Sequence, residues 1–254
     1  MKLNKLTASM VAVAAMAFGS SAQAINVGGV IWDPDDPIFD FSAQTNLFET
    51  IGLAVGDTFG GYGQITAVNA NGAFCPTCQL TYEFGGYSII KAAAVGDLTF
   101  AATGGFLKVY VQDTSAVGYT AFNANTKSTA TDGTLWLDLV ATNGILPVGT
   151  TLTGTVTIPN SNGASGQGAG YFNVVGGLAA ANLDTNGQPG GSDLTYTSTF
   201  QPLNAPVVNG GVTVATHFGN NNVFGESIPE PATLALLGLG LVGLGMSRRA
   251  KKAA

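Results

Sequence analysis

Basic side chains are nearly absent from the long middle of this sequence. Of nine lysines and arginines, only Lys91, Lys108 and Lys127 lie within residues 25–227, where fourteen acidic residues give a net charge of −11. Nucleic-acid binding needs lysine and arginine contacts to phosphates. The charge balance therefore excludes nucleic acid as a partner, and it disfavours acidic polymers unless cations bridge them.

Histidine and cysteine are also scarce. His217 is the single histidine, and the sequence has two cysteines. Nucleophilic catalysis needs a base beside the nucleophile, and an isolated histidine is more often a structural residue. The stretch 163–168 is not a nucleophile elbow, because Gln167 stands where G-x-S-x-G requires its last glycine. We expect a protein that is not an enzyme and has no resident cofactor.

The two cysteines, Cys75 and Cys78, are three positions apart, which leaves three interpretations. In an oxidising compartment they form a local disulfide, which we favour. A redox-active C-x-x-C usually opens a helix, whereas the residues after Cys78 alternate like a strand. A zinc site would need four ligands, and no second cysteine pair exists.

Acidic residues gather at the start of the middle segment. Calcium prefers several carboxylate oxygens in a flexible loop, so a calcium site is one interpretation of this cluster. The run lacks the glycine and the distal glutamate of a calcium loop, and its prolines suit a solvated turn, which we favour. The cluster consists of Asp33, Asp35, Asp36 and Asp40. A second acidic group, residues 184–186 with Asp193, leaves the same two interpretations open.

Apolar and polar residues alternate with the period of β-strands along the middle segment. The alternation is clear in residues 79–90, 134–144, 151–159 and 194–202. Residues 97–113 suggest a hairpin that turns at 103–105, and residues 42–51 and 173–181 could each hold a turn or two of helix. We therefore expect an all-β fold, an antiparallel sandwich or jelly-roll-like single domain over residues 25–227.

The first 24 residues have the layout of a secretory signal peptide. Lys2 and Lys5 precede a short apolar stretch, and the segment closes on an A-x-A cleavage site formed by Ala22 and Ala24. The apolar stretch is too short for a stable membrane span. We expect a signal helix over 1–24, export through the Sec translocon, and cleavage by signal peptidase before Ile25.

The last residues, 228–254, combine three elements in order. Pro229, Glu230 and Pro231 cannot continue a helix; residues 232–246 are apolar apart from Thr233; and a basic cluster follows, Arg248, Arg249, Lys251 and Lys252. A helix of that apolar length is about 22 Å long, against a hydrocarbon core of about 30 Å. We expect a short transmembrane helix with its basic end in the cytoplasm, inserted only transiently.

This tripartite tail resembles the PEP-CTERM sorting signal of Gram-negative bacteria. The resemblance implies that an exosortase, a membrane transpeptidase, recognises Pro229-Glu230-Pro231 and removes the tail. It also implies association with exopolysaccharide and with biofilm or floc formation. The expected destination is the cell surface or the extracellular matrix.

Several segments of the middle domain resemble a flocculation-associated subgroup of PEP-CTERM proteins. They include residues 80–87, 104–114 and 170–201, and no catalytic motif comes with them. This resemblance implies a structural role in binding cells to exopolysaccharide. The alternative is a secreted polysaccharide-binding lectin or glycan-active enzyme that uses Trp32, Trp136 or tyrosine residues to stack against sugars.

Overall fold

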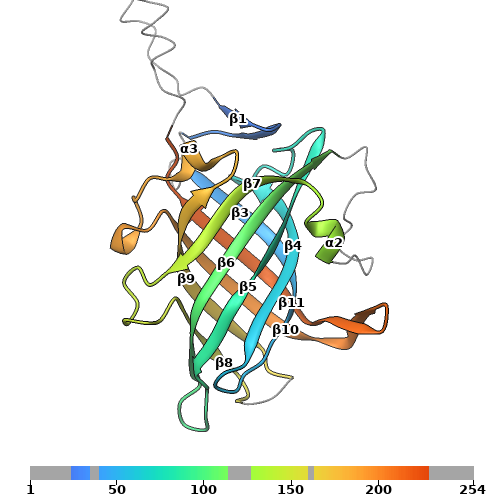
Figure 1. Cartoon of the computed structure of the whole chain (residues 1–254), viewed down its shortest axis with the longest axis vertical. Coiled ribbons are helices and arrows are strands. Elements are labelled where there is room, and N and C mark those ends of the chain that lie inside the picture. Colours follow the sequence, from blue (N-terminus) through green and yellow to red (C-terminus); the bar gives the residue numbers. More distant parts are fainter. Residues whose placement is uncertain (1–23, 35–39, 114–126, 160–162, 229–254) are drawn as a thin grey trace, which may run out of the picture.

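Antiparallel strands make up most of the chain in the computed structural model, which describes residues 24–34, 40–113, 127–159 and 163–228 (Figure 1). Two short helices, α2 (Lys127–Ala130) and α3 (Ala180–Leu183), and a 3-10 turn at Pro189–Gly191 lie between strands. The strands are β1 (Ile25–Val27), β2 (Val30–Trp32), β3 (Phe41–Thr50), β4 (Thr58–Val68), β5 (Cys78–Lys91), β6 (Thr99–Asp113), β7 (Thr134–Thr142), β8 (Leu152–Val156), β9 (Gly166–Gly176), β10 (Leu194–Asn209) and β11 (Val212–Gly225).

The main sheet closes on itself into a cylinder. Its strands follow the order β10-β11-β3-β4-β5-β6-β7-β9-β8, and β10 also pairs with β9, so the row of strands returns to its start. β8 pairs with both β6 and β9 and continues the wall beyond β7. Every pairing is antiparallel, which confirms the expected all-β antiparallel class.

Side chains from facing walls fill the interior. Along β3, alternate residues from Phe41 to Glu49 are buried, and the same period is present in β11 and β9. Phe41 of β3 stacks on Trp136 of β7, with ring centroids 6.2 Å apart. The two walls thus pack face to face as the layers of a sandwich do.

Glycines make room for the aromatic rings inside this narrow space. A side chain at Gly63 would lie 2.6 Å from the Tyr82 hydroxyl, and one at Gly170 would lie 3.3 Å from the Tyr196 ring. Gly154 and Gly166 likewise face the rings of Phe100 and Phe200. Large residues on one strand are therefore matched by glycine on the next, as small closed sheets require.

Three neighbouring strands bend along one line of paired glycines. The pairs, here called the glycine line, are Gly60-Gly61 on β4, Gly85-Gly86 on β5 and Gly104-Gly105 on β6, and the register between β4 and β5 shifts beside them. Gly86, Gly104 and Gly105 have positive φ, which favours glycine. Such kinks curve a sheet toward closure.

The hairpin expected at residues 103–105 is therefore wrong. β6 runs without interruption from Thr99 to Asp113, and Gly104-Gly105 bends it rather than reversing it. The helical turn expected at 42–51 is also wrong, because β3 occupies Phe41–Thr50 and pairs on both edges. In the 173–181 stretch β9 extends to Gly176, and the helix α3 starts at Ala180.

Replacing Gly104 with alanine tests the glycine line. The new methyl group would lie 2.6 Å from the carbonyl oxygen of Gly86, at a φ of +73°. We expect Gly104→Ala to lower the free energy of unfolding by about 2–4 kcal/mol through strain and overpacking, measured by urea denaturation.

Gly96→Ala is the matched control, because Gly96 has a φ of +92° but no atom within 4 Å of the added methyl group. It carries the backbone strain without the collision. Equal losses in the two variants would contradict a packing role for the glycine line.

Candidate functional site

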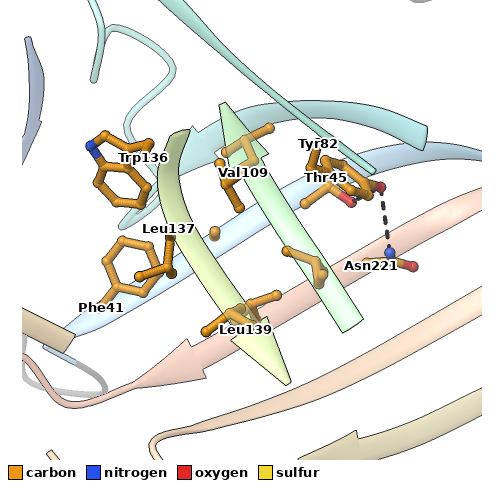
Figure 2. A pocket seen from close by; sticks show the side chains of 12 residues that line it. Phe41, Thr45, Tyr82, Val109, Trp136, Leu137, Leu139 and Asn221 are labelled. Carbon is orange, nitrogen blue, oxygen red and sulfur yellow. Dashed lines mark hydrogen bonds between the residues drawn. The ribbon is translucent and has the colours of Figure 1, made fainter. Parts of the chain in front are cut away.

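Polar side chains meet inside the cylinder around Tyr82 (Figure 2). The Tyr82 hydroxyl lies 2.9 Å from Thr45 Oγ1, donates to the carbonyl of Asn46 at 2.8 Å and accepts from Asn221 Nδ2 at 3.4 Å. The cavity beside them, which Phe41 and Leu139 also line, holds about 20 Å³. Such a space fits a single water molecule and no organic substrate.

A second cavity of about 20 Å³ lies beside a buried carboxyl group, that of Glu49. Glu49 on β3 and His217 on β11 pair in register, and both are buried. Burial raises the pKa of Glu49 to about 8, so its carboxyl is protonated at neutral pH. Burial also raises the pKa of the neighbouring Tyr196 hydroxyl.

His217 is a residue of this core. Its Nδ1 lies 2.8 Å from Thr216 Oγ1, and its ring meets Phe200 edge-on with centroids 6.0 Å apart. His217 is 1% exposed, so its ring lies away from solvent. Of the two structural positions that the sequence left open for this histidine, the surface and the core, His217 occupies the core.

Both tryptophans are buried, which corrects their assignment as sugar-stacking platforms. Trp32 is 2% and Trp136 0% exposed, and their rings meet edge-on at 5.9 Å. Trp136 Nε1 donates to the carbonyl of Val27 at 2.9 Å. The two rings fasten the β1–β2 hairpin to one end of the cylinder and leave no face for a ligand.

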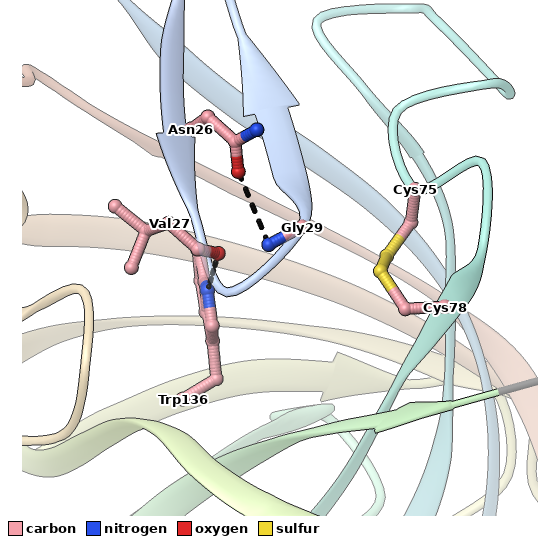
Figure 3. The surroundings of a disulfide bond; sticks show 6 residues. All are labelled: Asn26, Val27, Gly29, Cys75, Cys78 and Trp136. Carbon is pink, nitrogen blue, oxygen red and sulfur yellow. Dashed lines mark hydrogen bonds between the residues drawn. A yellow bond between two sulfur atoms is a disulfide. The ribbon is translucent and has the colours of Figure 1, made fainter.

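Cys75 and Cys78 are joined by a disulfide beside the turn of this hairpin (Figure 3). A side chain at Gly29, in the hairpin turn, would lie 3.2 Å from Cys78 Sγ. Next to the bridge, Ile31 N donates to the carbonyl of Phe74 at 2.8 Å. Cys78 opens strand β5 rather than a helix, so the setting of a redox C-x-x-C is absent here.

The first acidic cluster is only partly described, since Asp35 and Asp36 lie outside the described residues. Asn69 Nδ2 donates to the carbonyls of Asp33 and Asp40 at 2.8 and 3.1 Å and so joins the two ends of segment 35–39. Within the described ranges, no group of three or more histidines, cysteines and acids could hold a metal ion. The calcium interpretation therefore stays a prediction.

Asp193, from the second acidic group, is engaged by the backbone. Its carboxylate accepts hydrogen bonds from the amides of Val174, Thr185 and Asn186 at 2.7, 2.8 and 2.6 Å. These three donors satisfy a buried charge and tie β9 to the loop after α3. Asp193 thus acts as a structural anchor of this loop.

The residues before Pro229 are fastened to the body. Trp32 Nε1 donates to Ser227 Oγ at 3.3 Å, and the amide of Ser227 donates to Asp40 Oδ2 at 3.4 Å. Ile228 then exchanges two hydrogen bonds with Asn182, at 2.7 and 3.2 Å. The chain is held to the folded domain up to the residue that precedes Pro-Glu-Pro.

The described chain begins at the same end of the cylinder (Figure 1). Ile25, the residue after the expected cleavage point, is 1% exposed and pairs with Trp32. Trp32 in turn contacts Ser227. The two expected processing points therefore adjoin one small region of the fold.

The signal and sorting residues lie almost entirely outside the described residues. This applies to the cleavage-site residue Ala22, to the tripeptide Pro229-Glu230-Pro231 and to the basic cluster. The two terminal helices expected from the sequence also fall there. Within the described part, neither helix has the length and apolarity needed to cross a bilayer.

Comparison with known proteins identifies the tail. Residues 227–249 match the PEP-CTERM protein-sorting motif. No curated protein and no solved structure matches the chain. The motif implies an exported protein that an exosortase-type system sorts through a membrane-associated C-terminal signal.

Replacing Glu49 with glutamine tests the buried carboxyl. Because its pKa is about 8 in the folded state and 4.5 in the reference state, the folded protein binds a proton that the unfolded chain releases between these values. The contribution of Glu49 to stability is therefore full below pH 4.5 and declines as pH rises toward 8.

Between pH 5 and pH 8, we expect the free energy of unfolding of the wild type to fall by several kcal/mol relative to that of Glu49→Gln. Urea denaturation of both proteins at the two pH values measures this difference. A difference that stays constant across the range would contradict the buried, protonated carboxyl.

Proposed function

We propose that this chain is a non-enzymatic matrix protein, delivered by its sorting tail to the cell surface, where it supports exopolysaccharide-associated floc or biofilm formation. The observation that carries the proposal is the PEP-CTERM motif at residues 227–249, directly after a closed β-domain. The partners are an exosortase-type transpeptidase, the Sec translocon, signal peptidase and exopolysaccharide.

The interior of the domain supports a non-enzymatic role. The cavities beside Tyr82 and Glu49, each of about 20 Å³, are too small for a substrate. The groups that commonly do chemistry have structural partners instead: Asp193 binds three amides, and Cys75 is bonded to Cys78. The domain is built as a rigid body that presents its outer surface.

The flocculation role is supported by the resemblance of the body segments and by the placement of the tail. Ser227 and Ile228 are fastened to the domain, so whatever receives the processed C-terminus also receives the domain at a fixed distance. A rigid body on a short tether suits a protein that links cells to a polymer network.

The sorting step is tested by replacing Pro229, Glu230 and Pro231 with alanines in cells that produce the full chain. We expect loss of tail removal and retention of the intact chain in the inner membrane, because the alanines erase the rigid tripeptide. Mass spectrometry of the C-terminal peptides in surface and membrane fractions measures both effects.

Pro206→Ala is the matched control, since Pro206 is an exposed proline on β10 outside the motif. It should mature as wild type does. Normal maturation and location of the triple-alanine variant would refute recognition of the tripeptide.

The matrix role is tested by deleting residues 228–254. Without the tail we expect the domain to be released from the cells, and we expect clumping to fall to the level of a strain that lacks the protein. Sedimentation of the culture measures clumping, and immunoblotting of cells and medium measures location. Undiminished clumping with all of the protein in the medium would refute the surface role.

A further inference from the structure

Charge is distributed unevenly around the cylinder. The outer faces of β5, β6 and β7 carry the charged residues Glu83, Lys108 and Asp138. Lys108 forms an ion pair with Asp138 at 3.6 Å, and Glu83 forms one with Lys127 of α2 at 2.7 Å. The strands β3, β4, β8, β9, β10 and β11 contain no lysine, arginine or aspartate and a single glutamate, Glu49, and both Glu49 and His217 of β11 are buried. One whole side of the cylinder therefore has an uncharged wall.

That wall is lined by hydroxyl and amide side chains in register. Thr155 of β8 pairs with Gln167 of β9, which pairs with Thr199 of β10. Thr199 pairs with Asn220 of β11, and Asn220 pairs with Asn46 of β3. Neighbouring strands are about 4.8 Å apart, so these groups form a regularly spaced polar row across the sheet.

The row continues at both ends and has a parallel neighbour. It reaches Thr99 of β6 on one side and Gln64 of β4 on the other. Two residues along each strand, a second row crosses the same wall through Thr153, Ala169, Thr197 and Asn222, in which Ala169 is the apolar member. The surface thus offers hydrogen-bonding groups in two dimensions.

These rows border a hollow of about 480 Å³ on the outer surface, over β8, β9 and β10. Its volume is in the range of ligand sites, in contrast to the two interior cavities. No charged side chain lines it, and it contains none of the large apolar side chains that are exposed elsewhere. Phe218, 37% exposed, lies two residues from Asn220 on the same face of β11.

Several polar groups of the hollow have no use within the fold. The side chains of Thr155, Gln167, Thr197 and Asn220 are exposed, and none is hydrogen-bonded to another residue of the described ranges. Their donors and acceptors are available to a ligand. A ligand that matches them must itself carry closely spaced donors and acceptors.

We propose that this hollow binds a neutral polysaccharide chain laid along the polar rows. Pyranose hydroxyls are both donors and acceptors, as the threonine, asparagine and glutamine side chains here are. An acidic polymer would face a domain of net charge −11. No lysine or arginine lines the hollow, and Lys91, which donates to Thr99 at its edge, is paired with Asp97. A second protein would find none of the large apolar contacts that interface cores need.

The inference rests on the proposed matrix role, to which it gives a surface and a ligand class. The test uses the full-length protein, solubilised from producing cells in mild detergent. The probes are the neutral and acidic pools of the extracellular polysaccharide of those cells, separated by anion exchange. Affinity electrophoresis through gels that contain either pool measures binding, and we expect retardation by the neutral pool.

The test variant combines Gln167→Ala, Thr197→Val and Asn220→Ala, and we expect it to bind about tenfold or more weakly because three hydrogen bonds are lost. The matched control is Thr134→Val, an exposed threonine on the charged side of the cylinder, which should bind as wild type does. Thr197→Val alone keeps side-chain shape and β-branching, so a several-fold loss in this variant supports the site even if the triple variant is unstable.

Three results would overturn the inference: retardation of the wild type by the acidic pool alone, no retardation by either pool, or equal retardation of the wild type and both hollow variants. Size-exclusion chromatography adds a fourth, since a dimer that the triple variant abolishes would make this wall an interface between copies. The matrix role is judged separately, by whether cells with the triple variant still clump while tail-deleted cells do not.

Discussion

The whole fold depends on glycine facing aromatic side chains inside a closed sheet. The interior of such a small cylinder is just wide enough for side chains. An aromatic ring therefore fits where the neighbouring strand has a glycine, as Tyr82 does beside Gly63. The glycine line supplies the bend that lets the wall curve round. The two interior cavities described beside Tyr82 and Glu49 are water-sized, whereas the larger hollow lies on the outer wall.

The strand content of the domain could be predicted from the sequence, whereas the closure could not. Apolar and polar residues alternate with period two within β5, β7 and β10, and this local pattern is enough to predict strands. β3 contains good helix formers such as Gln44, Leu47 and Glu49, and only its pairing with both β4 and β11 makes it a strand. Gly104-Gly105 has the composition of a turn, and the pairing of β9 with β10 joins segments that no local pattern connects.

The candidate sites also divide into those that the sequence alone could predict and those that only the structure reveals. The signals at the two ends are continuous stretches whose chemistry is written in sequence order, and the family model finds the C-terminal one at the expected place. The polar row of the outer wall takes one residue from each of several strands, so it becomes visible only once the register is known. Trp32 and Trp136 show the reverse case, because aromatic residues that suggested a ligand surface belong to the core.

The attachment of the tail at the end of β11 decides how the domain bears mechanical load. β11 is hydrogen-bonded to β10 on one edge and to β3 on the other. A force applied at Ile228 acts first on the hydrogen bonds of Ser227 and Ile228 with other segments, and reaches the backbone ladders of β11 only after these bonds break. The end of the domain that precedes Pro229 is thus fastened to segments far away in the sequence, near Trp32, Asp40 and Asn182, so β11 is protected from being peeled off the sheet at this end.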